Sequence, residues 1–144
     1  MNRDVFYTLH SINKKMRKIA DRELQQFGLT STEMRLLNMI YFYDADGCTQ
    51  HEFLSKIEID RSNVGRSLKK LENLGYIRRE KNEEDQRALR VFLTEKGWSI
   101  KDELIGIREK IKEIFAMDMS GKDFDVLTRL LQRADANLSE ESSS

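Results

Sequence analysis

The apolar residues of this chain repeat at two different periods. From Val5 to Phe27 they recur mostly every three or four positions, the period of an amphipathic helix, and Gly28 ends that segment. From Leu89 to Leu93 they alternate with polar residues, the period of a strand. The pattern therefore predicts a mainly helical protein that contains a small sheet.

Capping residues predict where the other helices begin. Thr30 with Glu33, and Thr49 with Glu52, have the spacing of a capping box, and Asp60 precedes a further amphipathic segment that ends at Gly75. Near the C-terminus, Thr94 and the pair Ser120 and Asp123 give two more helix starts. The expected helices span about 5–27, 30–43, 49–57, 60–75, 94–114 and 120–138.

Two of these helices are short and are joined by a short turn, which is the arrangement of a helix-turn-helix over about 49–75. A strand from Tyr76 to Lys81, a polar turn and a return strand from Ala88 to Leu93 follow. They predict a β-hairpin over about 76–93, which projects beside the second helix because only the Gly75-Tyr76 corner separates them. Such a hairpin beside a helix-turn-helix is called a wing.

Charge is distributed unevenly along a chain whose net charge is zero. Between Asp60 and Arg79 there are six bases and two acids, a net charge of +4, whereas the segment from Gly97 to the end has a net charge of −3. A local basic block of this kind is compatible with an anionic partner that contacts one face of the protein.

On a helical wheel, the helix from Asp60 to Gly75 has two different faces. Val64, Leu68 and Leu71 form an apolar face. The opposite face carries Ser62, Arg66, Lys69 and Asn73. Such a row can contact base edges in the major groove of DNA, where an arginine binds guanine with two hydrogen bonds. The alternative is an ordinary solvated helix face.

The predicted wing adds further cations and an acid–base pair at its tip. An arginine at a wing tip can enter the narrow minor groove, and Asp85 can hold it in position through charge-assisted hydrogen bonds. The alternative is a plain surface ion pair. The candidate DNA-binding residues are Arg61, Ser62, Asn63, Arg66, Ser67, Lys69, Lys70, Asp85, Arg87 and Arg90.

The same region resembles a known family. LENLGYIRR, residues 71–79, is followed by Asp85, Arg87, Val91, Leu93, Thr94 and Gly97, and this order resembles the MarR family of winged helix-turn-helix transcription regulators. The resemblance implies a cytoplasmic homodimer that is built from its terminal helices and binds pseudo-palindromic operators. It also implies that Arg87 contacts the minor groove with support from Asp85.

Apolar stripes on the terminal helices argue for a dimer independently. The helices over about 5–27 and 95–138 carry stripes that need a partner, because a large exposed apolar face is a liability. Two-fold pairing would place the two recognition helices roughly 34–36 Å apart, one turn of DNA. We expect one winged helix-turn-helix domain over residues 1–139, with N- and C-terminal dimerisation helices, and a disordered tail over 140–144.

The remaining residues raise lesser possibilities. One cysteine excludes an internal disulfide, and no apolar run is long enough for a membrane span, so we expect a cytoplasmic protein without a membrane partner. Cys48 and His51 form half of a zinc-site pattern, and Cys48 could instead sense oxidants. The family resemblance also implies a small aromatic effector, which could bind near several residues that otherwise fill the core: Met16, Met34, Tyr41, Phe42 and Tyr43.

The sequence argues against an enzyme. It contains no P-loop and no glycine-rich dinucleotide loop, and two histidines are too few for most catalytic or metal schemes. We expect no cofactor. The preferred hypothesis is a sequence-specific transcription regulator that binds double-stranded DNA, a repressor released by an effector. The alternatives are a winged-helix module that binds an acidic protein, and a metal- or oxidant-sensing regulator of the same family.

Overall fold

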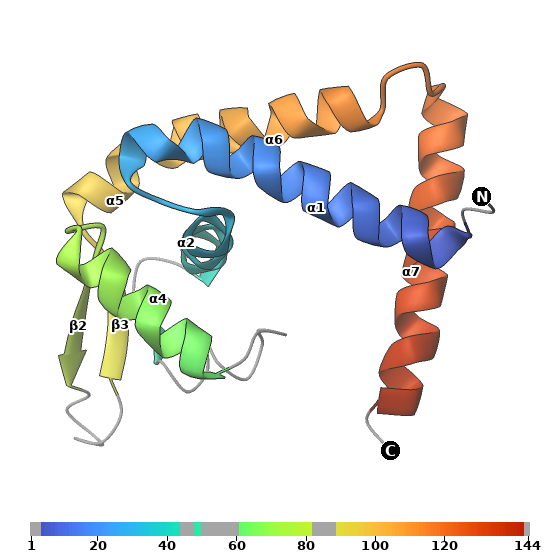
Figure 1. Cartoon of the computed structure of the whole chain (residues 1–144). Coiled ribbons are helices and arrows are strands. Elements are labelled where there is room, and N and C mark those ends of the chain that lie inside the picture. The colour runs from blue at the N-terminus through green and yellow to red at the C-terminus, as the bar shows by residue number, and fades with distance from the viewer. Residues whose placement is uncertain (1–3, 44–47, 50–60, 82–88, 143–144) are drawn as a thin grey trace. The chain divides into compact units, whose positions relative to one another are not determined.

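The computed structural model describes residues 4–43, 48–49, 61–81 and 89–142 (Figure 1). Its elements are α1 (Val5–Leu24), η1 (Gln25–Phe27), α2 (Ser31–Tyr43), β1 (Cys48–Thr49), α4 (Arg61–Asn73), β2 (Ile77–Lys81), β3 (Leu89–Leu93), α5 (Glu95–Ser99), α6 (Lys101–Phe115) and α7 (Gly121–Ser142). The chain forms two compact units, Met1–Arg108 and Glu109–Ser144.

The first helix begins and ends close to the predicted positions. The Asp4 carboxylate caps α1 by accepting a hydrogen bond of 2.9 Å from the Tyr7 N–H. The last three residues tighten into the 3₁₀ helix η1, and Gly28 ends it in the left-handed conformation, with a φ of 73°. Glycine is favoured there because it adopts a positive φ without a steric penalty.

The start of α2 is held by its own capping pair and by α1. Thr30 and Glu33, the predicted capping-box residues, are in contact, with the Thr30 hydroxyl donating to the Glu33 carboxylate. The Asp21 carboxylate of α1 accepts a hydrogen bond of 2.7 Å from the Ser31 N–H. One free backbone donor at the start of α2 is thereby satisfied from a different helix.

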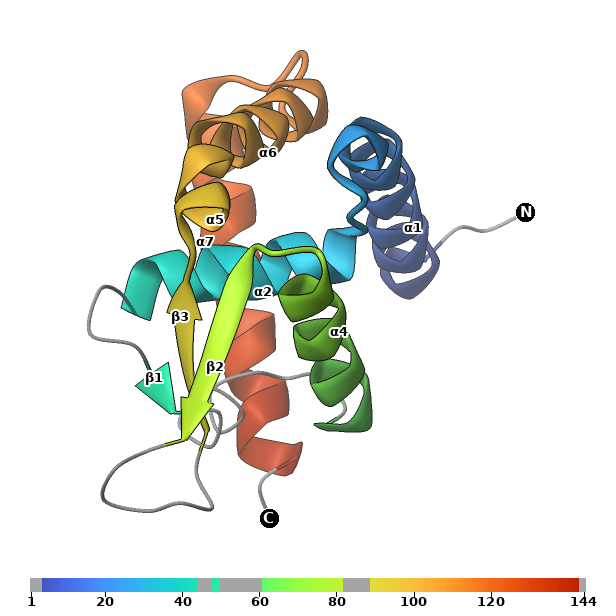
Figure 2. The same cartoon turned by 90° about the vertical axis from the view of Figure 1, so that its left-hand side faces the viewer.

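The predicted hairpin is confirmed and gains a third strand. β2 and β3 pair antiparallel, with Ile77 opposite Leu93 and Lys81 opposite Leu89. The two-residue strand β1 pairs with the other edge of β3, giving the strand order β1-β3-β2 (Figure 2). Two residues are too few to show a strand period, which is why β1 was missed. Thr49, the expected helix cap, pairs with Arg90 in this sheet, and residues 50–60 lie outside the described ranges.

Tyr76 joins four parts of the first unit. After Gly75, which has a φ of 85°, the Tyr76 N–H donates to the Leu71 carbonyl of α4 at 3.0 Å. Its hydroxyl donates to the Phe27 carbonyl at 2.7 Å, and its own carbonyl accepts from the Thr94 N–H at 3.1 Å. Burial raises the pKa of this phenol. The corner between α4 and the wing is therefore fastened to the end of α1 and to the start of α5.

The return from the wing into α5 depends on a close backbone approach. The Thr94 hydroxyl donates to the Gly75 carbonyl at 2.5 Å and accepts from the Gly97 N–H at 3.1 Å, as expected of a helix cap. A Cβ atom at Gly97 would lie 2.2 Å from the Tyr76 carbonyl oxygen. Only glycine fits at this position.

The long helix expected after Thr94 is interrupted at Ile100, between α5 and α6. The Tyr41 hydroxyl donates to the Gly97 carbonyl at 2.5 Å. In an unbroken α-helix that carbonyl would accept from the N–H of Lys101, four residues later. A side chain from α2 therefore occupies the carbonyl that would continue the helix.

The second unit contains the best example of a predicted capping box. The Ser120 N–H donates to the Asp123 carboxylate at 3.1 Å, and the Asp123 N–H donates to the Ser120 hydroxyl at 3.0 Å. Helix α7 continues to Ser142, so the prediction of a disordered tail was wrong for residues 140–142. Over the described residues, no helix is long and apolar enough to cross a membrane.

We predict that Gly97→Ala lowers the free energy of unfolding by about 3 kcal/mol, because the added methyl overlaps the Tyr76 carbonyl and the backbone must shift. Gly106→Ala in α6 is the matched control. No atom lies within 4 Å of a Cβ at Gly106, so we expect a stabilisation of roughly 0.5–1 kcal/mol. Urea unfolding at one fixed protein concentration measures both. Equal midpoints for Gly97→Ala and the wild type would contradict the close approach.

Candidate nucleic-acid interface

The orientation of α4 is set by its apolar face. Val64, Leu68 and Leu71 are each fully buried, and α4 packs beside α2 and the sheet (Figure 1). Complete burial of three aliphatic side chains contributes roughly 1.5–3 kcal/mol each. The opposite face of the helix is therefore presented to solvent, as the helical wheel predicted.

The polar row on that opposite face is accessible. Asn63, Arg66, Lys69 and Asn73 are exposed, and Ser67 is half-buried. The Arg66 guanidinium donates a hydrogen bond of 2.6 Å to the Asn63 side-chain oxygen, so the two side chains lie together one turn apart. Arg61 and Ser62 belong to the first turn of α4, and their side chains are outside the description. The described part of the row forms one polar, cationic surface.

Lys70, for which a phosphate contact stays a prediction, forms an ion pair with α2. Its ammonium lies 2.5 Å from the Glu33 carboxylate of α2, whose side chain is only 4% exposed. Burial acts to raise the pKa of Glu33, but the hydrogen bonds from Lys70 and Thr30 outweigh it and leave the pKa below its usual value. The pair neutralises a buried charge and fastens α4 to α2.

The arginines of the wing divide into structural and exposed groups. Arg79 is mostly buried and pairs with Glu72 of α4 at 3.1 Å, an interaction that lowers the pKa of Glu72. Arg78 is exposed and forms an ion pair with Glu80. Arg78 and Arg90 lie 4.5 and 5.6 Å from the centre of the Phe92 ring. Their guanidinium groups are thus held against the sheet near its outer surface.

The predicted wing tip, including Asp85 and Arg87, lies outside the described residues. His51 and Glu52 also lie outside them. Within the described ranges, no group of three or more histidine, cysteine, aspartate or glutamate side chains could hold a metal ion.

The residues considered for an aromatic effector do not share one environment. Met34 belongs to the buried core, whereas Phe42 is 80% exposed. Tyr41 is half-buried, with its hydroxyl bonded to Gly97 and its ring 5.7 Å from that of Trp98. Burial, with smaller effects of Tyr76 and Glu103, raises the pKa of Tyr41. These contacts favour core packing for Met34 and Tyr41.

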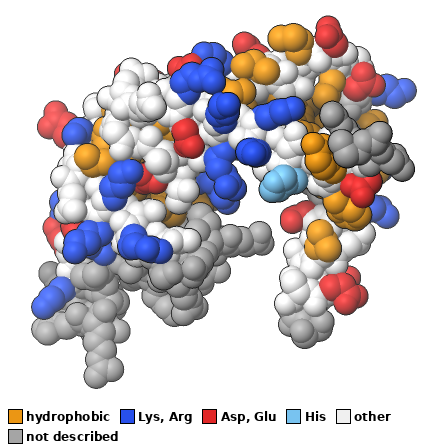
Figure 3. Space-filling model, viewed as in Figure 1, with side chains coloured by type: hydrophobic (Ala, Val, Ile, Leu, Met, Phe, Trp, Pro, Cys, Tyr) orange, Lys and Arg blue, Asp and Glu red, His pale blue; other side chains and the backbone are white. Residues whose placement is uncertain are grey.

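A second basic surface, on α1, was not recognised in the sequence. Figure 3 shows Lys and Arg side chains gathered along this helix as well as over α4. The exposed bases of α1 are Lys14, Lys15, Arg17, Lys18 and Arg22. The signal that could have revealed this surface in the sequence was the dense run of basic residues in the middle of an amphipathic helix.

This arrangement, a helix with one buried face and one polar cationic face beside a small antiparallel sheet, is that of a winged-helix DNA-binding protein. Comparisons with known proteins agree. The MarR family model matches residues 27–88. The HTH-type transcriptional regulator YybA of Bacillus subtilis is 24% identical over 135 residues, covering 94% of this chain and 89% of the relative.

A second relative, the HTH-type transcriptional regulator YdgJ of Bacillus subtilis, is 32% identical over 116 residues, covering 81% of this chain and 65% of the relative. The MepR–DNA complex of Staphylococcus aureus superposes with a TM-score of 0.86 at 22% identity, covering 93% of this chain and 98% of that one. The family that these comparisons indicate for the chain is the MarR family of transcription regulators. These relatives are regulators, in agreement with the expectation that the chain is not an enzyme.

We predict that Lys70→Met lowers the free energy of unfolding at pH 7 by about 1–3 kcal/mol, because it leaves the buried Glu33 carboxylate without its cation. Lys69→Met is the control, because Lys69 is one residue away and exposed. It should change the free energy of unfolding by no more than about 0.5 kcal/mol. Urea unfolding of both variants provides the comparison.

The effect of Lys70→Met should depend on pH. The pKa of Glu33 is lower in the folded protein than its usual value of 4.5 in the unfolded chain. The contribution of the ionised Glu33 to the free energy of unfolding is therefore fully present above pH 4.5, and it is lost as the pH falls through the pKa of the folded protein. The wild type should therefore lose more stability on acidification than Lys70→Met does. A pH-independent difference between the two proteins would show that the ion pair is not the cause.

Proposed function

We propose that this protein is a sequence-specific, DNA-binding transcriptional repressor that acts in the cytoplasm as a homodimer on a pseudo-palindromic operator. The observation that carries the proposal is the way α4 packs against the core. Its apolar face is fully buried, so the row around Asn63, Arg66 and Lys69 is the face available to a major groove. That a family neighbour, MepR, is described in complex with DNA supports this choice of partner.

Exposed apolar side chains support the dimer. In the first unit, Val5, Phe6 and Tyr7 at the start of α1 are 61%, 75% and 50% exposed. In the second unit, α7 carries further exposed apolar residues: Val126, Leu130, Leu131 and Leu138. Apolar side chains in such numbers at helix surfaces are typical of subunit interfaces. We propose that these helices pair two copies of the chain, and that release from DNA follows binding of a small aromatic effector.

The experiment that tests the proposal is a selection of genomic fragments on the purified protein, followed by a salt titration of the recovered duplex. Binding that engages phosphates makes the logarithm of the association constant fall linearly with the logarithm of salt concentration. We expect a steep slope and a protected site with two-fold symmetry. Failure to enrich any fragment, or a flat salt response, would contradict DNA binding and favour a protein partner.

We predict that Arg66→Ala weakens binding to the selected operator by about 1–3 kcal/mol and relaxes the base preference at one position of each half-site. Lys101→Ala in α6 is the control and should bind as the wild type does. Arg87→Ala should lower affinity to a similar degree through loss of the minor-groove contact. Fluorescence anisotropy on the operator and on single-base variants measures both effects. An unchanged base preference for Arg66→Ala would remove Arg66 from base recognition.

A further inference from the structure

A groove with three arginines lies between α1, α2 and α4. Arg17 comes from α1, Arg35 from α2 and Arg66 from α4, and the hydroxyl side chains Ser31, Thr32 and Ser67 also line it. We call this the arginine groove. Three positive charges from three helices converge there, and of the three only Arg66 was among the DNA-binding residues predicted from the sequence.

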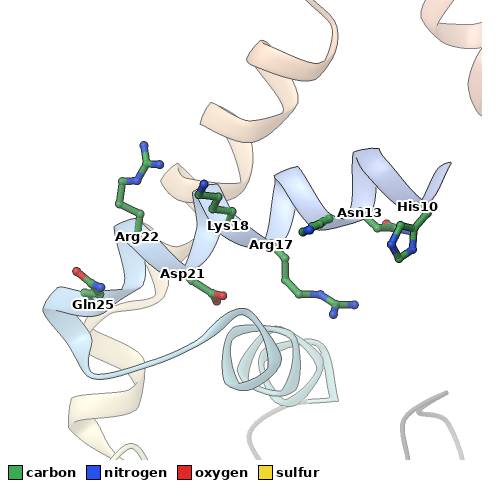
Figure 4. A pocket seen from close by; sticks show the side chains of 8 residues that line it. His10, Asn13, Arg17, Lys18, Asp21, Arg22 and Gln25 are labelled. Carbon is green, nitrogen blue, oxygen red and sulfur yellow. The ribbon is translucent and has the colours of Figure 1, made fainter. Parts of the chain in front are cut away.

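Two of these arginines are not balanced by an acid in the part of the chain that the structure describes. Among the residues that the structure describes, neither Arg17 nor Arg35 forms an ion pair, and both are exposed. Figure 4 shows Arg17 on the side of α1 that faces α2, whereas Arg22 points to the other side of the helix. Arg17 is thus directed toward the groove by its position on α1.

Among the described residues that line the groove, the one acid is already paired. The Glu33 carboxylate is neutralised by Lys70 and accepts a hydrogen bond from Thr30. Asp21 of α1 is not a lining residue, and its carboxylate accepts the Ser31 N–H. The start of α2, whose helix dipole adds partial positive charge, also borders the groove. The net field inside the groove therefore favours an anion.

We propose that the arginine groove binds a backbone phosphate of the same DNA that α4 contacts, an inference that rests on the proposed function. An α-helix with its side chains is about 10–12 Å across and fills a major groove about 12 Å wide. A phosphate strand must then pass on each flank of α4. The wing covers one flank, and the arginine groove, which shares Arg66 with the recognition face, lies on the flank toward α2.

Arg17 and Arg35 are consequently phosphate contacts, which fix the position of the protein on DNA but carry no sequence information. This differs from the role of Arg66, which reads bases. The two kinds of contact separate experimentally, because loss of a phosphate contact weakens binding to every sequence and reduces the salt dependence.

The test compares the wild type with the double variant Arg17→Gln/Arg35→Gln by anisotropy on the selected operator and on an unrelated duplex over a range of salt. We expect the slope of log association constant against log salt to become shallower by about 0.9, the value for one phosphate. Affinity should fall by about tenfold on both duplexes, with base preference unchanged. The single variants Arg17→Gln and Arg35→Gln should each give part of this fall. Arg22→Gln, on the other side of α1, is the matched control and should retain the wild-type slope.

The outcomes separate this inference from the proposed function. If the wild type binds DNA and the double variant keeps its slope and affinity, the arginine groove does not contact the backbone. If the slope is kept but the variant loses binding of inorganic phosphate, measured by NMR without DNA, the groove holds a free anion and the DNA assignment is overturned. If the wild type binds no DNA, the proposed function itself fails. Urea unfolding of each variant establishes that both substitutions leave the fold intact.

Discussion

The structure of the polar, cationic face of α4 depends on how this helix packs against α2. Val64, Leu68 and Leu71 are removed completely from water, and the Lys70–Glu33 pair fixes the helix at its last turn. A rotation of α4 about its axis would expose these aliphatic side chains and separate a buried carboxylate from its cation. The identity of the exposed row, from Asn63 to Asn73, is therefore a consequence of core packing.

The packing of α4 also positions the wing and the arginine groove. Tyr76 ties the end of α4 to η1 and to Thr94 at the start of α5, and the Glu72–Arg79 pair fastens α4 to β2. The wing is thus held beside the recognition helix by directed bonds at its base. On the other side of α4, neutralisation of Glu33 by Lys70 leaves the arginine groove with its positive charge. One ion pair therefore serves both the stability of the fold and the electrostatics of its surface.

Local signals in the sequence predicted most of the secondary structure. The helix cap at Thr94, the capping box of Ser120 and Asp123, and the helix end at Gly75 each involve residues no more than four positions apart. The sequence spacing alone was therefore sufficient to predict them. The burial of Val64 and Leu68 followed from helix periodicity. The family motif also contained Gly97. Glycine is required there because the Tyr76 carbonyl approaches closely, and this contact between residues 21 positions apart could not be derived from a local sequence pattern.

The features that the sequence did not reveal are long-range contacts. The pairing of Lys70 with Glu33 joins residues 37 positions apart, and the Tyr41 hydroxyl of α2 bonds the Gly97 carbonyl just before the break at Ile100. The arginine groove requires three helices to be assembled before its residues meet.

Lysine acetylation, read by mass spectrometry with and without the operator duplex, tests the central claim most directly. If the exposed face of α4 lies against DNA, Lys69 becomes protected on binding, while Lys122 at the start of α7 keeps the same reactivity. A Lys69 that reacts equally fast in the complex would contradict the assignment of this face to DNA.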